Sequence, residues 1–522
     1  MKHLLFYLSL FCSLGIQAQT LLPLPVQQQA GNGTFALDRR YKLVSNLKGE
    51  DSKYIKEQVA MLMGSPQSTA QAQPRGVIML RLNPGGSAAE GYKLNVTTDT
   101  IRIEASTAAG IFYGIQTLRQ LEQQQRIPCT KIADSPRFVH RGFMLDTSRH
   151  FWSKEFIKKQ IDALAYFKLN SLHLHLTDSE GWRIQIKKYP QLTDETAYRP
   201  LINHSQWIDG GRKYCKKGTP GAYGGYYTQK DLKEIVAYAR SRYINVIPEI
   251  EIPGHSHEVM QVFKDLSCTG QGDGFDLCVG NERTFKFLTD VLKEVISVFP
   301  SKVIHVGGDE ATMLYWKKCP KCIGLYNRMN MTDTTQIQGY IISRIDSFLT
   351  ANGRRMIGWD EILDGTTLSP QALVMSWRGE QGGIKASQMK HHVVMSPSKF
   401  YYLDHYQDKP ETQPKAFGGY SPLEKVYTYD PVPAELKGTD AEKYIDGIQG
   451  NLWTECVETS SHAEYMMYPR LLAIAETAWG TKSSYADFRK RVLSMESYLR
   501  SKGYNCFDLN RETDTYKTET AK

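Results

Sequence analysis

From residue 136 onward, short apolar runs alternate with longer stretches in which apolar residues recur at helical spacing. Eight runs read as buried strands: 142–145, 171–176, 244–250, 303–306, 356–359, 373–377, 393–396 and 445–453. Helices are predicted between several of them, at 154–167, 229–240, 282–299, 334–352 and 465–479. Apolar strands that alternate with helices are typical of a parallel sheet buried on both faces. The fold class is therefore α/β, and eight strands favour a closed (β/α)8 TIM barrel over an open sheet.

The segment before residue 136 has a different pattern. Short β-rich runs occupy 41–44, 76–82, 92–96 and 101–105, and one helical stretch follows at 108–124. This order predicts a small α+β domain in which a helix packs on a sheet. Residues 133–137 are expected to form its exit linker, because Pro and Asp discourage helix there. We therefore expect an α+β domain at 19–135 and a catalytic barrel with C-terminal helices at 136–522.

Residues 1–18 read as a signal peptide. Lys2 begins the segment, residues 4–16 are almost wholly apolar, and Ala18 places a small residue at the expected cut. The apolar run is too short for a membrane span, and no later stretch approaches one. We expect an exported, soluble protein, periplasmic or extracellular; a lipoprotein acylated at Cys12 is the weaker alternative, because bulky Phe11 precedes it.

Charge and cysteine content narrow the class further. The net charge is +9 without a run of Lys or Arg, so nucleic-acid binding is not indicated. Without Cys12 eight cysteines remain, an even number that permits disulfides in an oxidising compartment. Cys268, Cys278, Cys319 and Cys322 lie in two loop-like regions. A four-thiolate zinc site is one interpretation of this set, but export favours disulfides that join or close the loops.

Charged, His and Trp residues gather where the apolar runs end. The first four runs lead into Arg149, Asp178, His255 and the pair Asp309-Glu310. An isolated polar residue after a strand is more often a turn former or a helix cap, but capping does not call for His or Trp. Because the carboxyl ends of all strands in a TIM barrel meet at one mouth, these groups are expected to share one active-site cleft.

Three tryptophans stand at the ends of the fifth, sixth and eighth runs: Trp359, Trp377 and Trp453, the first and the last of them with an acidic residue within two positions. Core packing explains any one of them, but three aromatic rings beside carboxylates suit a sugar, which packs on rings and donates from its hydroxyls. Asp309 and Glu310 do not fit the usual retaining glycosidase, whose two carboxyls lie about 5–5.5 Å apart on separate segments. One of the two must have another task.

The run His305-Val-Gly-Gly-Asp-Glu-Ala311 makes the resemblance specific. Together with His173-x-His175-x-x-Asp178, Gly181-Trp-Arg183, Pro253-Gly-His255 and the three tryptophan motifs in this order, it resembles glycoside hydrolase family 20, the β-N-acetylhexosaminidases, over about residues 21–479. The resemblance implies an exo-acting enzyme that removes terminal β-linked GlcNAc or GalNAc with retention. The substrate's own acetamido oxygen attacks the anomeric carbon, which gives an oxazolinium intermediate.

The same resemblance implies a role for each site residue. Glu310 protonates the glycosidic oxygen and later activates water, while Asp309 orients the acetamido group. We also expect the charge of Asp309 to help keep Glu310 protonated near neutral pH. Tyr402 holds the acetamido oxygen, and Asp178 and His255 form a relay behind Glu310. The sugar hydroxyls and ring are expected to contact Arg149, Asp404, Glu455, Trp359, Trp377 and Trp453.

Several expectations follow for ligands. No metal or cofactor is required, and His173 and His175 are expected to pack or hydrogen-bond below the barrel mouth. Asp404 and Glu455 near carbon six should repel a 6-sulfate. Glu251 replaces the Asp of many relatives, which puts its share in the relay in doubt. Two alternatives stay open: a barrel glycosidase that releases a disaccharide or a sulfated sugar, and a carbohydrate-binding protein that has lost catalysis.

Overall fold

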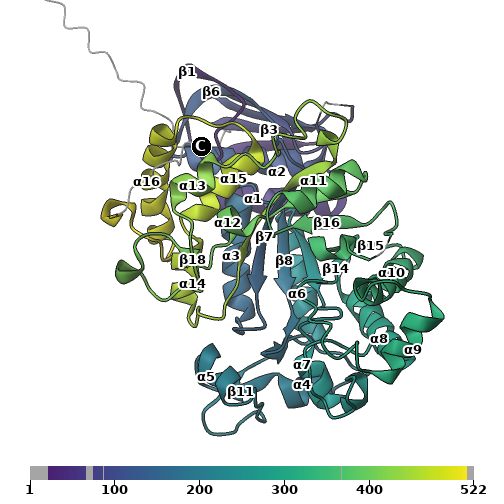
Figure 1. The fold of residues 1–522 in the computed structure, drawn as a ribbon. Helices are drawn as coiled ribbons and strands as arrows, with labels where there is room; N and C mark the ends of the chain where they lie inside the picture. Colours follow the sequence, from purple (N-terminus) through teal and green to yellow (C-terminus); the bar gives the residue numbers. More distant parts are fainter. Residues whose placement is uncertain (1–20, 66–74, 86–87, 366, 514–522) are drawn as a thin grey trace, which may run out of the picture.

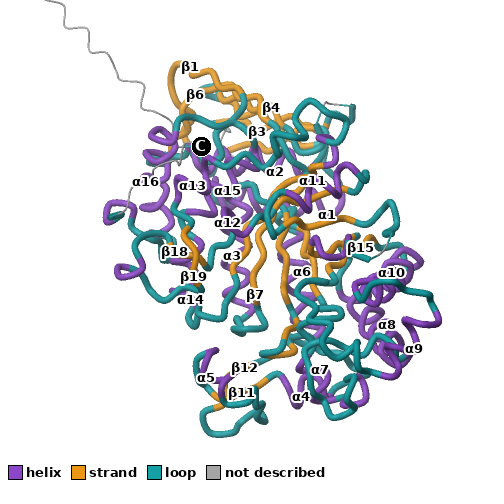
Figure 2. The backbone as a smooth tube through the Cα atoms, in the orientation of Figure 1, coloured by secondary structure: helices purple, strands orange, loops and turns teal. Residues whose placement is uncertain are grey.

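The computed structural model describes residues 21–65, 75–85, 88–365 and 367–513, so the predicted signal peptide lies outside the described residues. A small sheet with its helices lies at the top of the view in Figure 1, and a larger barrel lies below it. In the tube drawing of Figure 2 the barrel strands run through the centre and helices surround them. The small sheet comes first along the chain and the barrel second, and the chain passes from one to the other near residue 136, where the hydrophobic pattern changes.

Eight parallel strands close the barrel, which confirms the predicted fold class. Their order around the barrel is β13 (Asn245–Glu249), β14 (Val303–His305), β15 (Arg355–Trp359), β16 (Leu373–Ser376), β17 (His392–Met395), β20 (Ile445–Leu452), β7 (His140–Asp146) and β8 (Ser171–His175). The outer helices are α3 (Lys154–Tyr166), α6 (Gln229–Arg240), α8 (Glu282–Val298), α10 (Thr335–Ala351), α11 (Gln381–Gln388) and α15 (Arg470–Trp479).

The loops between these elements carry shorter ones. After β8 come β9 (Thr177–Asp178), β10 (Gly181–Trp182), α4 (Gln191–Thr196), β11 (Tyr198–Pro200), α5 (His204–Asp209) and β12 (Ala222–Gly224). After β13 and β14 come α7 (His257–Val262) and α9 (Pro320–Arg328). After β17 come α12 (Ser398–Tyr401), β18 (His405–Tyr406), β19 (Gly418–Tyr420) and α13 (Leu423–Thr428), and the chain ends in α14 (Ser460–Met467), α15 and α16 (Tyr485–Ser501).

Strand β8 shows how the barrel separates two kinds of interior. Leu172 and Leu174 join the large apolar core of the protein. The alternate residues His173 and His175 are fully buried and meet Glu249 of β13. Because successive side chains on a strand point to opposite faces, the polar set lies inside the barrel. The barrel therefore holds charged groups beneath its mouth, packed in by an apolar shell.

The small domain contains more structure than the sequence pattern predicted. Its sheet has the order β1 (Gln27–Ala36), β6 (Arg126–Asp134), β4 (Tyr92–Val96), β5 (Thr100–Ala105), β3 (Gly76–Leu82) and β2 (Tyr41–Ser45), with helices α1 (Gly49–Met63) and α2 (Ala108–Leu121). Strand β1 escaped prediction because it is an edge strand whose only buried residue is Phe35. The expected linker at 133–137 is corrected as well, since β6 continues to Asp134.

Asp134 fixes the small domain to the barrel. Its carboxylate accepts hydrogen bonds from the Tyr92 hydroxyl at 2.7 Å and from Trp479 Nε1 at 2.8 Å, and it lies 2.9 Å from Lys168 Nζ. These partners come from the small sheet, from α15 and from the turn after α3. A buried carboxylate with this many donors holds its neighbours in one arrangement.

Two further predictions need correction. The single helix expected at 465–479 is two helices, α14 and α15, separated at Pro469, which has no N–H to donate within a helix. The disulfides favoured for Cys268, Cys278, Cys319 and Cys322 are not formed in this structure, in which all four are free thiols. None of the helices in the described ranges combines the length and the hydropathy needed for a transmembrane span.

Candidate active site

A cavity of about 280 Å³ opens at the carboxyl ends of the barrel strands. Its lining consists of Arg149, His255, Asp309, Glu310, Trp377, Ser398, Tyr402, Asp404, His405, Phe417, Trp453 and Glu455. This volume lies near the lower end of ligand pockets, about 300 Å³, and suits one small polar ring. Nine of the eleven site residues named from the sequence line this one cavity; Asp178 and Trp359 do not.

The turn after β14 sends Asp309 and Glu310 in different directions. Gly307 has φ of 65°, and a Cβ there would lie 1.8 Å from Glu251 Oε2, so only glycine fits. Glu310 itself has φ of 50°. As a result the side chain of Asp309 is 10% exposed, whereas that of Glu310 is 57% exposed at the mouth. The two adjacent carboxylates therefore have different environments, one enclosed and one open.

His255 joins both carboxylates to Asp178. Its Nε2 lies 3.5 Å from Asp309 Oδ2 and 3.5 Å from Glu310 Oε2, and its Nδ1 lies 3.1 Å from the Asp178 carboxylate. Although burial favours the neutral ring, Asp178 and Asp309 raise the pKa of His255 well above its ordinary value. The geometry brings Asp178, His255 and Glu310 into one chain of contacts.

The expectation about Glu310 needs correction. The sequence suggested that a neighbouring negative charge would help keep Glu310 protonated. In the structure the contact with His255 Nε2 at 3.5 Å, and then the charge of that ring, lower the pKa of Glu310 below its ordinary value, although burial opposes this. The imidazolium of His255 is the closer influence on the exposed carboxylate, so the free site favours ionised Glu310.

Beneath His255 the chain of charges continues into the barrel. His175 Nδ1 lies 2.5 Å from Glu249 Oε2, and its Nε2 lies 3.2 Å from Asp178 Oδ2. Against the effect of burial, these carboxylates raise the pKa of His175 to about 10. Burial opposes ionisation of Glu249 too, but the imidazoles of His305 and His175 hold its pKa well below the ordinary value. Positive and negative groups thus alternate from the barrel axis to the mouth.

Glu249 is a site residue that sequence reasoning missed. Besides His175 it contacts His305 Nδ1 at 2.7 Å and accepts a hydrogen bond from Trp359 Nε1 at 3.0 Å. Its position in a strand that reads Asn-Val-Ile-Pro-Glu was the available signal, because a charged residue inside an apolar run must find partners. The His and Glu groups here could in principle hold a cation, but they already pair with one another.

Arg149 is surrounded by carboxylates. Its guanidinium nitrogens lie 2.7 Å from Asp178, 3.1 Å from Glu180, 3.2 Å from Asp146 and 3.4 Å from Glu455. Burial opposes its charge, but these four groups together raise the pKa of Arg149 well above its ordinary value. The result is a rigid cation at the cavity wall, with its donors fixed before any ligand arrives.

Three of the aromatic residues that line the cavity lie close together, and a further one lies next to them outside the lining. The rings of Trp377 and Tyr402 are stacked at 6.1 Å, and Tyr402 and Trp453 meet at 6.2 Å. Trp359 was expected to wall the cavity but is not among its lining residues; it is 1% exposed and lies 5.9 Å from Trp453, beneath it. Ser398, His405 and Phe417 line the cavity and had no motif in the sequence that singled them out.

Three buried carboxylate oxygens in the lining lack a hydrogen-bond partner among the described residues: Asp309 Oδ1, Asp404 Oδ1 and Glu455 Oε2. Burial, and then the charge of Glu455, raise the pKa of Asp404 well above its ordinary value; burial also raises that of Glu455. Because buried polar atoms are nearly always paired, unpaired acceptors in a cavity mark where a ligand donates hydrogen bonds. The arrangement is that of a site for a polyhydroxylated or amide-bearing ring.

Comparison with known proteins agrees with this geometry. The chain matches the family model for the glycosyl hydrolase family 20 catalytic domain over residues 138–482 and that for domain 2 of the same family over residues 18–135. The beta-hexosaminidase of Porphyromonas gingivalis is 39% identical over 508 residues, and that of Vibrio furnissii is 36% identical over 487 residues. The alignments cover 90% and 89% of this chain, but 62% and 77% of those proteins.

Solved structures give the same result. The GH20 exo beta-N-acetylglucosaminidase from Vibrio harveyi, in complex with N-acetylglucosamine, is similar with a TM-score of 0.82 and 30% identity, covering 94% of this chain and 78% of that one. The beta-N-acetylhexosaminidase from Bacteroides fragilis has a TM-score of 0.78 and 27% identity, covering 95% and 99%. With both of its parts matched, the chain belongs to glycosyl hydrolase family 20.

Proposed function

We propose that this protein is an exo-β-N-acetylhexosaminidase that removes terminal, non-reducing β-linked GlcNAc or GalNAc from glycans with retention of configuration. The substrate's 2-acetamido group, rather than a protein side chain, acts as the nucleophile and gives an oxazolinium intermediate. The named relatives, beta-hexosaminidases of Porphyromonas gingivalis and Vibrio furnissii, support this substrate class.

The observation that carries the proposal is the contrast between the two adjacent carboxylates. Glu310 is exposed at the mouth, where the leaving part of a glycan would extend, so it suits the role of acid and then base. Asp309 is enclosed, and its Oδ1 has no partner in the described part of the chain, so it suits an amide N–H of the bound sugar. A carboxylate in contact with that N–H also stabilises the positive charge that develops on the acetamido nitrogen.

The remaining lining residues complete the reaction site. The Tyr402 hydroxyl would donate to the acetamido oxygen and hold it against the anomeric carbon, which gives the proximity that an intramolecular attack requires. Trp377 and Trp453 would enclose the acetamido methyl and the ring. His255 and Asp178 would position Glu310 from behind, through the contacts described above.

Glu310 must be protonated to act as the acid, although His255 lowers its pKa in the free protein. A bound glycan would cover the exposed carboxylate and remove water from it. Since desolvation favours the neutral form of a carboxyl group, binding raises the pKa of Glu310 towards the working pH. The protonated state is therefore coupled to occupation of the site.

Exo action follows from the enclosed end of the cavity. Arg149, Asp404 and Glu455 are largely buried lining residues that would close this end, and the volume of about 280 Å³ leaves room for one sugar. Hydroxyls at carbons three, four and six of a terminal residue would pair with these groups. A glycan that continued beyond the terminal sugar would have to displace the buried carboxylates.

The experiment is product stereochemistry combined with inhibition. Proton NMR during early hydrolysis of an aryl N-acetyl-β-glucosaminide should show the β-anomer first, and a thiazoline that mimics the oxazolinium should inhibit competitively. Glucosides with a plain hydroxyl at carbon two should not be hydrolysed at comparable rates. An inverted first product, or a glycosyl ester trapped on a protein carboxylate, contradicts the proposal.

A further inference from the structure

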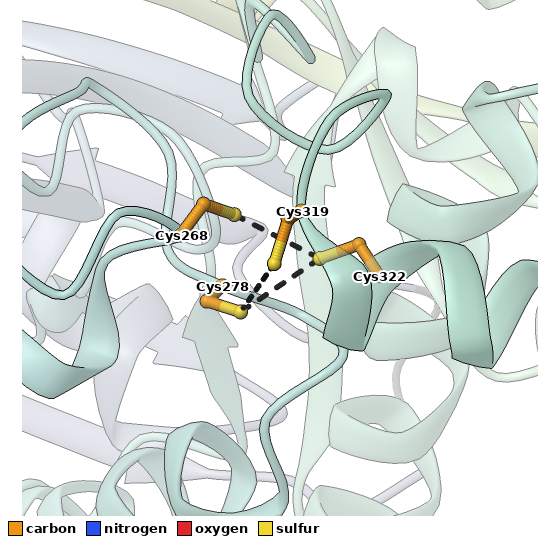
Figure 3. A group of neighbouring side chains, drawn as sticks. All are labelled: Cys268, Cys278, Cys319 and Cys322. Carbon is orange, nitrogen blue, oxygen red and sulfur yellow. Dashed lines mark hydrogen bonds between the residues drawn. The ribbon is translucent and has the colours of Figure 1, made fainter.

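Four cysteine sulfurs converge on one point in the outer shell of the barrel. Cys268 and Cys278 lie in the loop between β13 and α8, whereas Cys319 and Cys322 lie at the start of α9 after β14. Figure 3 shows the four side chains pointing towards one another. Sγ atoms are 3.6 Å apart for Cys278 and Cys319, 3.7 Å for Cys278 and Cys322, and 3.8 Å for Cys268 and Cys322. All four sulfurs lie within 4.8 Å of one another.

These separations distinguish between two kinds of chemistry. A disulfide needs its sulfurs about 2.05 Å apart, and it would draw them together in two pairs. Four thiolates held about 2.3 Å from a central zinc ion stand about 3.8 Å apart from each other. The observed distances match the edges of such a tetrahedron, and Cys278 and Cys322 each have two close sulfur neighbours rather than one.

The surrounding backbone supports negative charge on the sulfurs. The amide N–H of Gly280 donates to Cys322 Sγ at 3.3 Å. A Cβ on Gly280 would lie 2.2 Å from the carbonyl carbon of Lys321, so glycine is needed for the loop to approach the helix this closely. Cys319 is the N-cap of α9 and Cys322 lies in its first turn, where the helix dipole lowers the free energy of a thiolate.

Burial makes an unliganded arrangement of thiolates costly. Cys278 and Cys322 are 0% exposed and Cys319 is 4% exposed, while Cys268 is partly exposed and closes the outer side. A cluster of charged sulfurs removed from water needs a cation at its centre. Soft thiolate ligands in a tetrahedral set select zinc among the common divalent ions.

We propose that Cys268, Cys278, Cys319 and Cys322 bind one structural Zn²⁺ ion. The ion replaces the four thiol protons, which are released to solvent, and four Zn–S bonds form without any change in oxidation state. The resulting tetrathiolate carries a net charge of −2. With four protein ligands the site is closed, so the metal takes no part in the hydrolysis.

The position of the site gives it a task. The loop after β13 carries His255, and the turn after β14 carries Asp309 and Glu310. Asp276, two residues before Cys278, accepts hydrogen bonds from the Thr312 hydroxyl at 2.6 Å, from the Thr312 amide at 3.0 Å and from the Met313 amide at 2.8 Å. A zinc ion bound by both loops would hold them in this relative position. It would thereby also hold His255 in contact with Glu310.

The test begins with the wild-type protein purified from the compartment in which it accumulates, without added metal or reductant. Elemental analysis should give about one zinc per chain, and X-ray absorption at the zinc edge should give four sulfurs at about 2.3 Å. The four thiols should resist alkylation until a chelator removes the metal, and then react. Two disulfides with no zinc in this protein, read from its intact mass and from the absence of these thiols, would overturn the proposal.

Variants add a second measurement. The double variant Cys319→Ser/Cys322→Ser should lose the zinc completely and unfold at a lower temperature, with kcat reduced more than KM is changed, because the loops that carry the site are released. Cys215→Ser, a change of a partly exposed cysteine elsewhere, should keep one zinc per chain and full activity. If the double variant does not fold, the zinc content and the X-ray absorption of the wild-type protein are sufficient to test the proposal. Unchanged zinc content in a folded double variant contradicts the proposal.

Discussion

The imidazole Nε2 of His255 lies 3.5 Å from Oε2 of Glu310, and this contact lowers the pKa of the exposed carboxyl in the free protein. The pKa of the proposed acid is therefore lowered by a side chain from a different loop, the one after β13. His255 in turn keeps its proton because Asp178 stands behind it. The pH dependence of the enzyme should report this arrangement directly.

Replacing His255 with Phe should move the alkaline limb of kcat/KM to higher pH. In the free enzyme, activity falls as Glu310 loses its proton, so this limb follows the pKa of Glu310. Loss of the contact with His255 and of its positive charge removes the influences that lower this pKa, and the pKa rises. A pH profile of kcat/KM on an aryl N-acetylglucosaminide checks the shift. His462→Phe, a change of a partly buried histidine on α14, is the control; a limb that stays in place or moves to lower pH contradicts the assignment.

Glu310→Gln and Asp309→Asn should be separable by leaving group. Without a proton donor, the Glu310 variant should lose about 10²–10⁴-fold in kcat on a disaccharide, and much less on a glycoside whose phenol leaves without protonation. The Asp309 variant should lose about 10²–10³-fold on both substrates, because charge on the acetamido nitrogen develops with either leaving group. The two variants differ by one residue position, so they control for each other. Equal leaving-group dependence would contradict the separate roles.

Asp404 and Glu455 should make the enzyme reject a 6-sulfated sugar, and the rejection should grow with pH. Burial raises the pKa of both carboxyls, so each is neutral at low pH and gains its charge as pH rises through that raised value. Repulsion of a sulfate therefore increases in the same direction. The ratio of kcat/KM for unsulfated and 6-sulfated aryl N-acetylglucosaminides, measured across pH, checks this.

The double variant Asp404→Asn/Glu455→Gln should reduce that ratio by about tenfold or more, corresponding to about 1.4 kcal/mol, and should remove most of its pH dependence. Equal rates on the two substrates with the unaltered protein would show that these groups do not face carbon six.

Most of the barrel could be predicted because each of its strands forms an apolar run that can be recognised in the sequence without the others. The edge strand β1 could not, since nine of its ten residues are exposed and show no alternation of buried and exposed positions. The site was predictable where a residue type was unusual after a strand, as with Asp309 and Trp453. Phe417 was not, because it reaches the cavity from an irregular segment whose path the sequence does not fix.

The roles of neighbouring groups were harder to predict than their presence. The sequence placed Asp309 next to Glu310 and suggested repulsion between them, whereas the turn at Gly307 separates their environments and brings His255 to Glu310. Trp359 is the last residue of β15, whereas Trp377 and Trp453 directly follow their strands, and its indole N–H donates to Glu249 in the barrel interior. In both cases the direction in which each side chain points from the backbone, and not its position along the chain, determines which groups it contacts.

Glu249 and Glu251 offer a matched test of the buried charges, because they lie two residues apart and are both buried. Glu249 is held ionised by His305 and His175, and it accepts from Trp359. Both oxygens of Glu251 lack hydrogen-bond partners within the described ranges, and burial, then the charge of Asp309, raise its pKa well above the ordinary value. Glu249 therefore contributes as an anion, and Glu251 as a neutral acid.

Glu249→Gln should lower stability by about 3–5 kcal/mol, because it leaves the protonated imidazole of His175 buried without this counter-charge. Glu251→Gln keeps the shape and the neutrality of the acid, so its melting temperature at pH 7 should stay close to that of the wild type. For Glu249 the folded-state pKa lies below the unfolded value, so its contribution is present above about pH 4.3 and is lost as pH falls through the folded value. Thermal unfolding of the three proteins at pH 7 and in acid checks both statements: the gap between wild type and Glu249→Gln should narrow in acid. Equal destabilisation by the two changes at pH 7 would mean that Glu251 is also ionised. This result would contradict its assignment as a neutral acid next to the alternating charges.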